Sequence, residues 1–281
     1  MSINREKIWR KDITGLRAVA VIPVLIFHAF PEFLPGGFYG VDIFFVISGY
    51  LISGIIFRGL IDGSFSFVDF YDKRIRRIIP NLICVIIFVV VLGWFFTTAL
   101  EFEKIGGNVS HSAFFYQNFA LMREDGYFGI PSQSNPLLHI WSLSIEEQFY
   151  LIFPILCFLI WKFGKNSVFC LGVFVIGITF SSFVICLMIS DQTVRFYLPF
   201  SRFWELGLGI CIAYAEIFLN LETRRYGRKV ADVLSVIGFS LILCSLCVPT
   251  SWYAPSPGVF SILPVFGSVL LILANANALV N

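Results

Sequence analysis

The sequence predicts an all-α membrane protein, a polytopic transmembrane helix bundle of about eight spans with a cytoplasmic N-terminus. Three observations support this fold class: 58% of the 281 residues are hydrophobic, only 14% are charged, and the apolar residues come in long unbroken runs. A soluble domain of this length keeps about a quarter of its residues charged. Runs of about 20 apolar residues without strict alternation satisfy their backbone polar groups in lipid as helices.

Eight runs are long enough to cross a bilayer. Residues 105–122 are a ninth candidate, but they carry polar side chains such as Asn108 and Gln117, so we expect a re-entrant or interfacial segment there. The whole stretch 100–136 is rich in glycine, serine and asparagine, and is expected to form a partly ordered cap on the outer face. The eight runs are 13–32, 38–57, 78–99, 137–161, 167–190, 196–219, 230–250 and 258–280.

The basic residues give the expected orientation, because cytoplasmic loops carry an excess of lysine and arginine. With the N-terminus inside and eight spans, fifteen of the 20 basic residues are cytoplasmic, and only Lys104, Arg123 and Arg195 lie in outer loops. Making 105–122 a span would place six of those fifteen outside. We therefore expect a multi-pass protein of the cell inner (cytoplasmic) membrane, with both ends of this chain in the cytoplasm.

Ionisable groups inside the predicted spans are the most informative residues, because charge in a bilayer is costly and persists where it faces a cavity or a partner. Arg17 and His28 lie eleven residues apart in the first run. On a helix they are about 20° apart around the axis and about 16 Å apart along it, with Arg17 nearer the cytoplasm. Their shared face indicates a functional pair, and a merely interfacial histidine is the alternative.

The second and third runs carry charges near their outer and inner ends. Asp42 shares a helical face with Gly49 and Ser53. Helix packing explains the glycine, but it does not explain the aspartate. Arg74 and Arg77 begin the third run, where they form either a clamp for phosphate groups, which arginine binds bidentately, or an ordinary positive-inside anchor.

The fourth and sixth runs contain acidic residues. Ser142 and Glu146 share one helical face, and Glu147 adjoins them; two adjacent carboxylates at this depth need a partner or a wet cavity. Arg202 and Glu205 are an i,i+3 pair that can neutralise each other, as a structural salt bridge or as part of a site.

These residues lie in five blocks that resemble acyltransferase family 3, the integral-membrane O-acyltransferases that modify extracytoplasmic glycans. The resemblance covers essentially the whole chain. The family's basic form has ten spans, so the resemblance implies one membrane-embedded acyltransferase domain over residues 1–281, truncated at its C-terminal end. The blocks are DITGLRAVAVIPVLIFHA (12–29), GGFYGVDIFFVISGYLIS (36–53), FYDKRIRRIIP (70–80), LLHIWSLSIEEQFYLIFP (137–154) and FYLPFSRFWELGLG (196–209).

The resemblance also implies which residues act. His28, Asp42 and Glu146 are expected to be catalytic, with His28 as the general base near the outer side and one of the two carboxylates orienting its imidazole. A two-step route through an acyl-histidine is the alternative. The expected substrate-binding residues are Arg17, Arg74, Arg77, Ser142, Arg202 and Glu205.

The implied reaction moves an acyl group, expected to be acetyl, from cytoplasmic acyl-CoA to a hydroxyl of a surface or lipid-linked glycan. Lipopolysaccharide O-antigen or another surface polysaccharide is the expected acceptor. Arg74 and Arg77 would bind the CoA phosphates at the inner surface, below Arg17.

We expect the lipid bilayer and a possible separate periplasmic protein as partners, but no nucleic acid, no metal and no permanently bound cofactor. Two other readings stay open. The chain could be a transporter of a small anion or acyl group, although transporters often show internal repeats and none is evident. It could also be an inactive truncated homologue.

Overall fold

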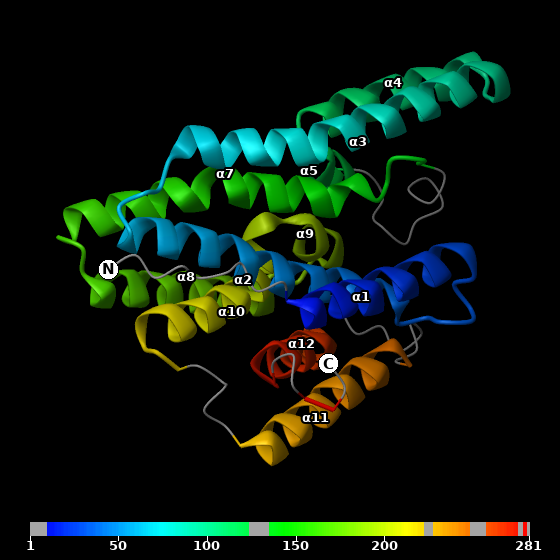
Figure 1. Ribbon diagram of the computed structural model, residues 1–281. Coiled ribbons are helices and arrows are strands. Elements are labelled where there is room, and N and C mark those ends of the chain that lie inside the picture. Colours follow the sequence, from blue (N-terminus) through cyan, green and yellow to red (C-terminus); the bar gives the residue numbers. More distant parts are fainter. Residues whose placement is uncertain (1–9, 124–134, 222–226, 248–256, 275–277, 280–281) are drawn as a thin grey trace. The chain divides into compact units, whose positions relative to one another are not determined.

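The computed structural model is built from α-helices (Figure 1). It describes residues 10–123, 135–221, 227–247, 257–274 and 278–279, and no β-strand occurs in these ranges. The all-α fold class is therefore confirmed. The helices are α1 (Lys11–Ala29), α2 (Gly40–Ile61), α3 (Phe67–Phe96), α4 (Ala99–Ala113), α5 (Gln117–Arg123), α7 (Ile140–Phe163), α8 (Val168–Met188), α9 (Gln192–Tyr197), α10 (Pro199–Phe218), α11 (Arg228–Leu246) and α12 (Ile262–Ala274), with 3-10 helices at Gly37–Tyr39 and Val259–Ser261.

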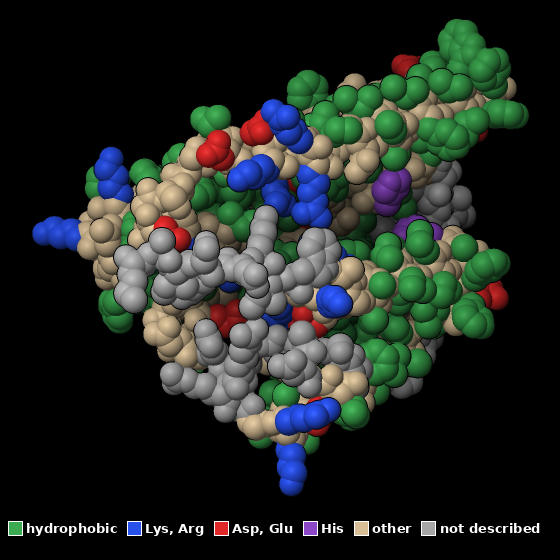
Figure 2. Space-filling model, viewed as in Figure 1, with side chains coloured by type: hydrophobic (Ala, Val, Ile, Leu, Met, Phe, Trp, Pro, Cys, Tyr) green, Lys and Arg blue, Asp and Glu red, His purple; other side chains and the backbone are tan. Residues whose placement is uncertain are grey.

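Among the described residues, six helices are long and apolar enough to cross a membrane: α1, α2 with the 3-10 turn before it, α3, α7, α8 and α11. Large apolar side chains on α3 are exposed, as expected of a surface that faces lipid; Phe95 and Phe96 are 73% and 81% exposed. Figure 2 shows hydrophobic side chains along the second half of α3 and basic ones along its first half. The multi-pass membrane character of the chain is thus confirmed.

The predicted count of eight spans is wrong for the described part of the chain. α10 is 20 residues long, but it carries Arg202, Glu205 and Glu216, which are too many charges for a helix in lipid. The apolar segment Val259–Ala274 is shorter than the roughly 20 residues that a bilayer requires. The end of the seventh run (248–250) and residues 275–277 of the eighth lie outside the described residues.

The orientation of the spans relative to the cytoplasm stays a prediction. Four of the basic residues on which it rests, Arg5, Lys7, Arg224 and Arg225, lie outside the described residues, as does 124–134 of the expected outer cap. The first three spans are among the six that the structure supports. A cytoplasmic N-terminus would therefore still place the beginning of α3 at the inner surface.

Helix α3 begins at Phe67, well before residue 78 where the third span was expected. Ser66 starts it early, because its side chain accepts a hydrogen bond from the backbone N–H of Asp69 (3.2 Å) and satisfies a donor of the first turn. Arg74 and Arg77 therefore lie about two and three turns inside α3, rather than at its start.

The expected outer loop is largely helical where the structure describes it, in α4 and α5. A capping box begins α4: the backbone N–H of Thr98 donates to Glu101 Oε2 (2.9 Å), and the backbone N–H of Glu101 donates to Thr98 Oγ1 (3.4 Å). The hydrogen bonds that the backbone N–H and the hydroxyl of Thr98 donate to Glu101 Oε2 lower the pKa of this carboxyl. Ile105 then packs against Leu82 and Val89 of α3, so that burial stabilises the helix. The prediction of a partly ordered cap missed α4 and α5.

The chain divides into two compact units, which we call the terminal unit (Met1–Gly54 and Glu205–Asn281) and the central unit (Ile55–Trp204). In the terminal unit, α11 and α12 pack side by side, and Gly238 and Gly267 allow their backbones to approach closely. In the central unit, α3 lies along α7: the Phe67 and Phe158 rings are 5.2 Å apart, and the hydroxyl of Tyr71 donates to the carbonyl oxygen of Leu151 (2.9 Å).

Two glycines of the terminal unit bring α2 and α10 into backbone contact. A Cβ atom at Gly49 would lie 2.0 Å from the carbonyl oxygen of Leu206, and one at Gly209 would lie 2.1 Å from the carbonyl oxygen of Val46. Both distances are far below van der Waals contact. The close approach that small residues permit between membrane helices therefore fixes α10 beside α2.

Gly49→Ala is expected to destabilise the protein by about 1–3 kcal/mol, because one extra methyl group forces the two backbones apart. The measurement is the thermal unfolding midpoint of the detergent-solubilised protein. Gly177→Ala on α8 is the matched control: it meets nothing within 4 Å, and alanine favours a helix over glycine. Equal midpoints for the two variants would contradict the backbone contact.

Candidate functional site

His28 lies near the end of α1 with one ring nitrogen engaged. Its Nδ1 is 2.8 Å from the carbonyl oxygen of Val24, one turn earlier. A carbonyl oxygen can only accept, so Nδ1 carries the proton and Nε2 keeps its lone pair in the neutral ring. The side chain is exposed, and the Phe27 ring packs edge-to-face against it at 5.5 Å. This arrangement presents an oriented basic nitrogen, as a general base requires.

Arg17 and Asp42 also belong to the terminal unit. Arg17 is half-buried on α1, and Pro23 lies inside the same helix between Arg17 and His28. Asp42 is in the first turn of α2 and is 1% exposed. The orienting contact on Nδ1 of His28 comes from a backbone carbonyl. A carboxylate that orients the ring, from Asp42 or from Glu146, therefore stays a prediction.

In the central unit, Arg74 of α3 faces a group of side chains on α7. Its guanidinium carbon is 6.0 Å from the centre of the Tyr150 ring, within cation–π range. The Tyr150 hydroxyl donates to Glu146 Oε2 (3.2 Å). Glu146 and Glu147 are both close enough to interact electrostatically with Arg74. We call Arg74, Glu146, Glu147 and Tyr150 the α3–α7 cluster; the sequence pointed to three of its members, but not to Tyr150.

Arg77 of α3 and Ser142 of α7 were also predicted to bind substrate, and both belong to the central unit. Arg77 is exposed one turn beyond Arg74, and the two guanidinium charges interact. Ser142 is half-buried, and its hydroxyl donates to the carbonyl oxygen of His139 in the preceding turn (3.3 Å). Arg77 is thus available to an anionic ligand from solvent, whereas Ser142 Oγ is turned toward its own backbone.

Arg202 is enclosed by protein. It is 1% exposed, its Nε–H donates to the carbonyl oxygen of Phe196 (3.1 Å), and its guanidinium carbon lies 4.7 Å from the Phe196 ring centre and 5.5 Å from that of Trp141. These contacts hold α7, α9 and α10 together. Glu205, one turn along α10, is fully buried. The part that Arg202 and Glu205 play in substrate binding stays a prediction.

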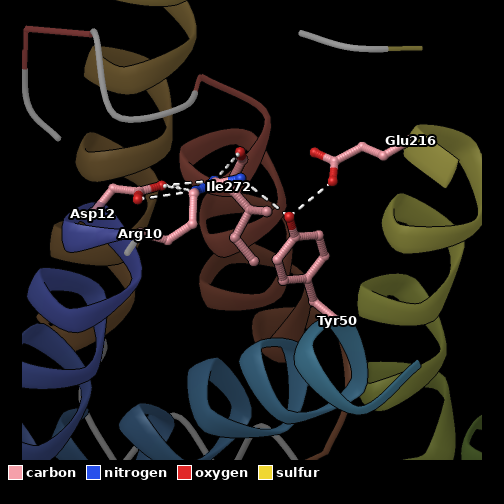
Figure 3. A network of polar contacts seen from close by, with 5 residues as sticks. All are labelled: Arg10, Asp12, Tyr50, Glu216 and Ile272. Atoms are coloured by element: carbon pink, nitrogen blue, oxygen red, sulfur yellow. Dashed lines mark hydrogen bonds and ion pairs between the residues drawn. The ribbon is translucent and has the colours of Figure 1, made fainter. Parts of the chain in front are cut away.

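A polar network in the terminal unit was missed by the sequence reasoning, which counted Arg10 only among the fifteen basic residues expected in the cytoplasm. Arg10 pairs with Asp12 (Nη2–Oδ2 2.6 Å) and donates to the Tyr50 hydroxyl (3.0 Å) and to the carbonyl oxygen of Ile272 (3.1 Å). The Tyr50 hydroxyl in turn donates to Glu216 Oε2 (2.8 Å), as Figure 3 shows. The network joins the start of α1 to α2, α10 and α12.

The electrostatics of this network favour a permanently charged arginine. Burial lowers the pKa of Arg10, but the hydrogen bonds that it donates to Asp12 and its electrostatic interactions with Tyr50, Asp12 and Glu216 raise it by more, so the net pKa is raised. No short sequence motif links these residues, since Arg10 is separated from Tyr50 by 40 positions and from Ile272 by 262.

With the geometry established, comparison with known proteins identifies the family. The family described as "Acyltransferase domain" matches residues 10–279, a range that includes every candidate residue above. The chain belongs to this family. The resemblance to acyltransferase family 3 is thereby confirmed, whereas the roles of individual residues stay predictions.

Three relatives illustrate the similarity. An uncharacterized protein of Haemophilus influenzae is 35% identical over 244 residues, which are 82% of this chain and 96% of that protein. The peptidoglycan O-acetyltransferase OatA of Listeria monocytogenes is 36% identical over 83% of this chain, and the O-acetyltransferase OatA of Staphylococcus aureus is 30% identical over 81%. The match spans only 38% of the length of either OatA protein. No solved structure matches the chain.

Proposed function

We propose that this chain transfers an acetyl group from acetyl-CoA to a hydroxyl group of a cell-surface glycan. The observation that carries the proposal is the family match over residues 10–279, together with two relatives named as O-acetyltransferases, one of them of peptidoglycan. Several apolar helices support a site embedded in a membrane. We place the protein in the inner membrane, where cytoplasmic acetyl-CoA and an extracytoplasmic glycan can reach opposite ends of the helices.

The α3–α7 cluster and Arg77 are the proposed donor site. CoA carries a pyrophosphate and a 3′-phosphate, and arginine recognises phosphate through charge-assisted, bidentate hydrogen bonds. Arg74 is held against the Tyr150 ring, and the exposed Arg77 adds a second charge. The positive-inside pattern predicts that this part of α3 lies on the side where acetyl-CoA is made.

His28 is the proposed general base. Its Nε2 takes the proton of the acceptor hydroxyl while the hydroxyl oxygen bonds to the thioester carbonyl carbon. The carbon–sulfur bond then breaks, and the CoA thiolate takes the proton back from the imidazolium. The hydrogen bond from Nδ1–H to the carbonyl oxygen of Val24 keeps Nε2 as the basic nitrogen throughout the cycle.

Lipopolysaccharide O-antigen or another surface polysaccharide is the proposed acceptor, either finished or still lipid-linked, and a separate periplasmic protein is a possible partner. The test compares surface glycans from cells with and without the gene by mass spectrometry. Loss of ester-linked acetyl groups in the deletion, restored by the wild-type gene, is the expected result. Identical glycans would count against the proposal and favour a transporter or an inactive homologue.

A further inference from the structure

Glu147 is the member of the α3–α7 cluster whose carboxyl group has a buried oxygen without a hydrogen-bond donor. Its Oε1 atom is inaccessible to solvent and has no hydrogen-bond partner. A buried, ionised carboxylate oxygen without a donor is costly. Glu146 differs, because the Tyr150 hydroxyl donates to it and so favours its ionised form. Glu146 and Glu147 are adjacent and interact with the same arginine. If one of the two carboxylates binds a proton, Glu147 is therefore the one expected to do so.

The charge balance of the donor site depends on that proton. With both glutamates ionised, they cancel the charges of Arg74 and Arg77, and the site has no net attraction for a phosphate. With a proton on Glu147, the same four side chains carry one net positive charge. The half-buried part of the site, Arg74 with the two glutamates, then changes from a net charge of −1 to neutral, and it no longer repels an anion that the exposed Arg77 attracts.

We propose that Glu147 is a positioning residue that binds a proton and thereby keeps Arg74 available to the phosphates of the donor. This inference rests on the proposed function, because it concerns how the same site recognises acetyl-CoA. It assigns different tasks to two neighbouring carboxylates: Glu146 is the ionised partner of Tyr150, and Glu147 is the neutral one.

Other ionisable groups on the helices around α7 lie elsewhere. α8 carries no charged residue, and α5 meets α7 through the amides of Asn118 and Gln148 (2.9 Å). Arg202 lies over the ring of Trp141, at the beginning of α7, and Arg195 is buried on α9. The remaining charged residues on α2, α4 and α5 within the central unit are exposed: Arg58, Glu101, Glu103, Lys104 and Arg123; His111 of α4 is half-buried beside Tyr116. Arg74 and Glu146 thus dominate the surroundings of Glu147.

The experiment measures binding of CoA to purified, detergent-solubilised protein from mildly acidic to mildly alkaline pH. Wild-type affinity is expected to fall about tenfold as the pH rises, since ionisation of Glu147 removes the net positive charge. Glu147→Gln mimics the protonated side chain. This variant is expected to keep the acid-side affinity across the range, apart from the titration of the ligand's own phosphate, which acts in the opposite direction.

Asp72→Asn is the matched control, because it also removes one carboxylate from this region but an exposed one, paired with Arg76 at 2.8 Å. It is expected to keep the wild-type pH dependence. Tyr150→Phe gives an independent check: loss of the hydroxyl makes the cluster take up a proton more readily, so the fall in affinity moves to higher pH.

Three outcomes would overturn the inference. If Glu147→Gln loses CoA binding at every pH, the ionised carboxylate is needed. If Glu147→Gln keeps the wild-type fall in affinity, another group titrates. If Tyr150→Phe leaves the profile unchanged, the proton is not shared in this cluster. Wild-type protein that binds no CoA at any pH would instead refute the proposed donor, and this inference with it.

Discussion

His28→Asn is expected to abolish acyl transfer in a protein that still folds. The asparagine side chain can donate an N–H to the carbonyl oxygen of Val24 in place of Nδ1–H, but it has no basic nitrogen where Nε2 stands. Loss of a general base lowers a rate by about 10²- to 10⁴-fold. The measurements are the rate of acetyl transfer and the thermal unfolding midpoint of the purified variant.

A second histidine provides the control for this prediction. His139 is exposed at the N-terminal end of α7, in the central unit. His139→Asn is expected to retain most of the activity, because neither the donor site nor the proposed base uses its ring. Near-normal transfer by His28→Asn would eliminate the general-base role, whereas a collapsed unfolding midpoint would point to a structural role for the Val24 contact.

Replacing Arg74 and Arg77 together by glutamine is expected to weaken CoA binding at least tenfold. A hydrogen bond to a charged group contributes roughly 1.5–3 kcal/mol, and two such groups are lost. The single Arg74→Gln change should carry the larger share, because Arg74 is half-buried against Tyr150 while Arg77 is exposed. Lysine at both positions should restore binding only in part, since it keeps the charge without the planar fork.

Arg76 supplies the matched control on the same helix. It is an exposed arginine that forms a surface ion pair with Asp72 (2.8 Å), and exposed pairs contribute little. Arg76→Gln is therefore expected to change CoA affinity by less than about twofold. If the double variant binds CoA as tightly as Arg76→Gln does, Arg74 and Arg77 are membrane-topology anchors and the donor site lies elsewhere.

Much of the fold follows from the sequence because length and hydrophobicity determine which segments can lie in lipid. The runs behind α1, α2, α7, α8 and α11 are helices that begin and end within a few residues of the expected positions. α3 begins early and α4 was missed, although both carry a readable signal: Ser66 three residues before Asp69, and the Thr98–Glu101 capping box. α10 entered the predicted count of eight because its apolar run is long enough, but Arg202, Glu205 and Glu216 keep it out of the helices that are apolar enough to cross a membrane.

Less of the candidate site could be predicted from the sequence, because its contacts join residues that are distant in the chain. The pattern pointed to His28, Arg74 and Glu146, but it could not show that a backbone carbonyl orients the imidazole. Nor could it show that Tyr150 donates a hydrogen bond to Glu146. Residues distant in sequence, such as Arg10 and Ile272, meet only once the helices have packed.

We propose that the chain moves an acetyl group from CoA on one side of a membrane to a glycan hydroxyl on the other. The most direct test uses the purified protein reconstituted in sealed vesicles. Acetyl-CoA with a labelled acetyl group is added on the side of the membrane where Arg74 lies, and a surface polysaccharide is present on the opposite side. With wild-type protein, label is expected in ester linkage to the polysaccharide, and with His28→Asn none is expected there. Label that crosses as free acetate or acetyl-CoA, or that never leaves CoA with the wild-type protein, would contradict it.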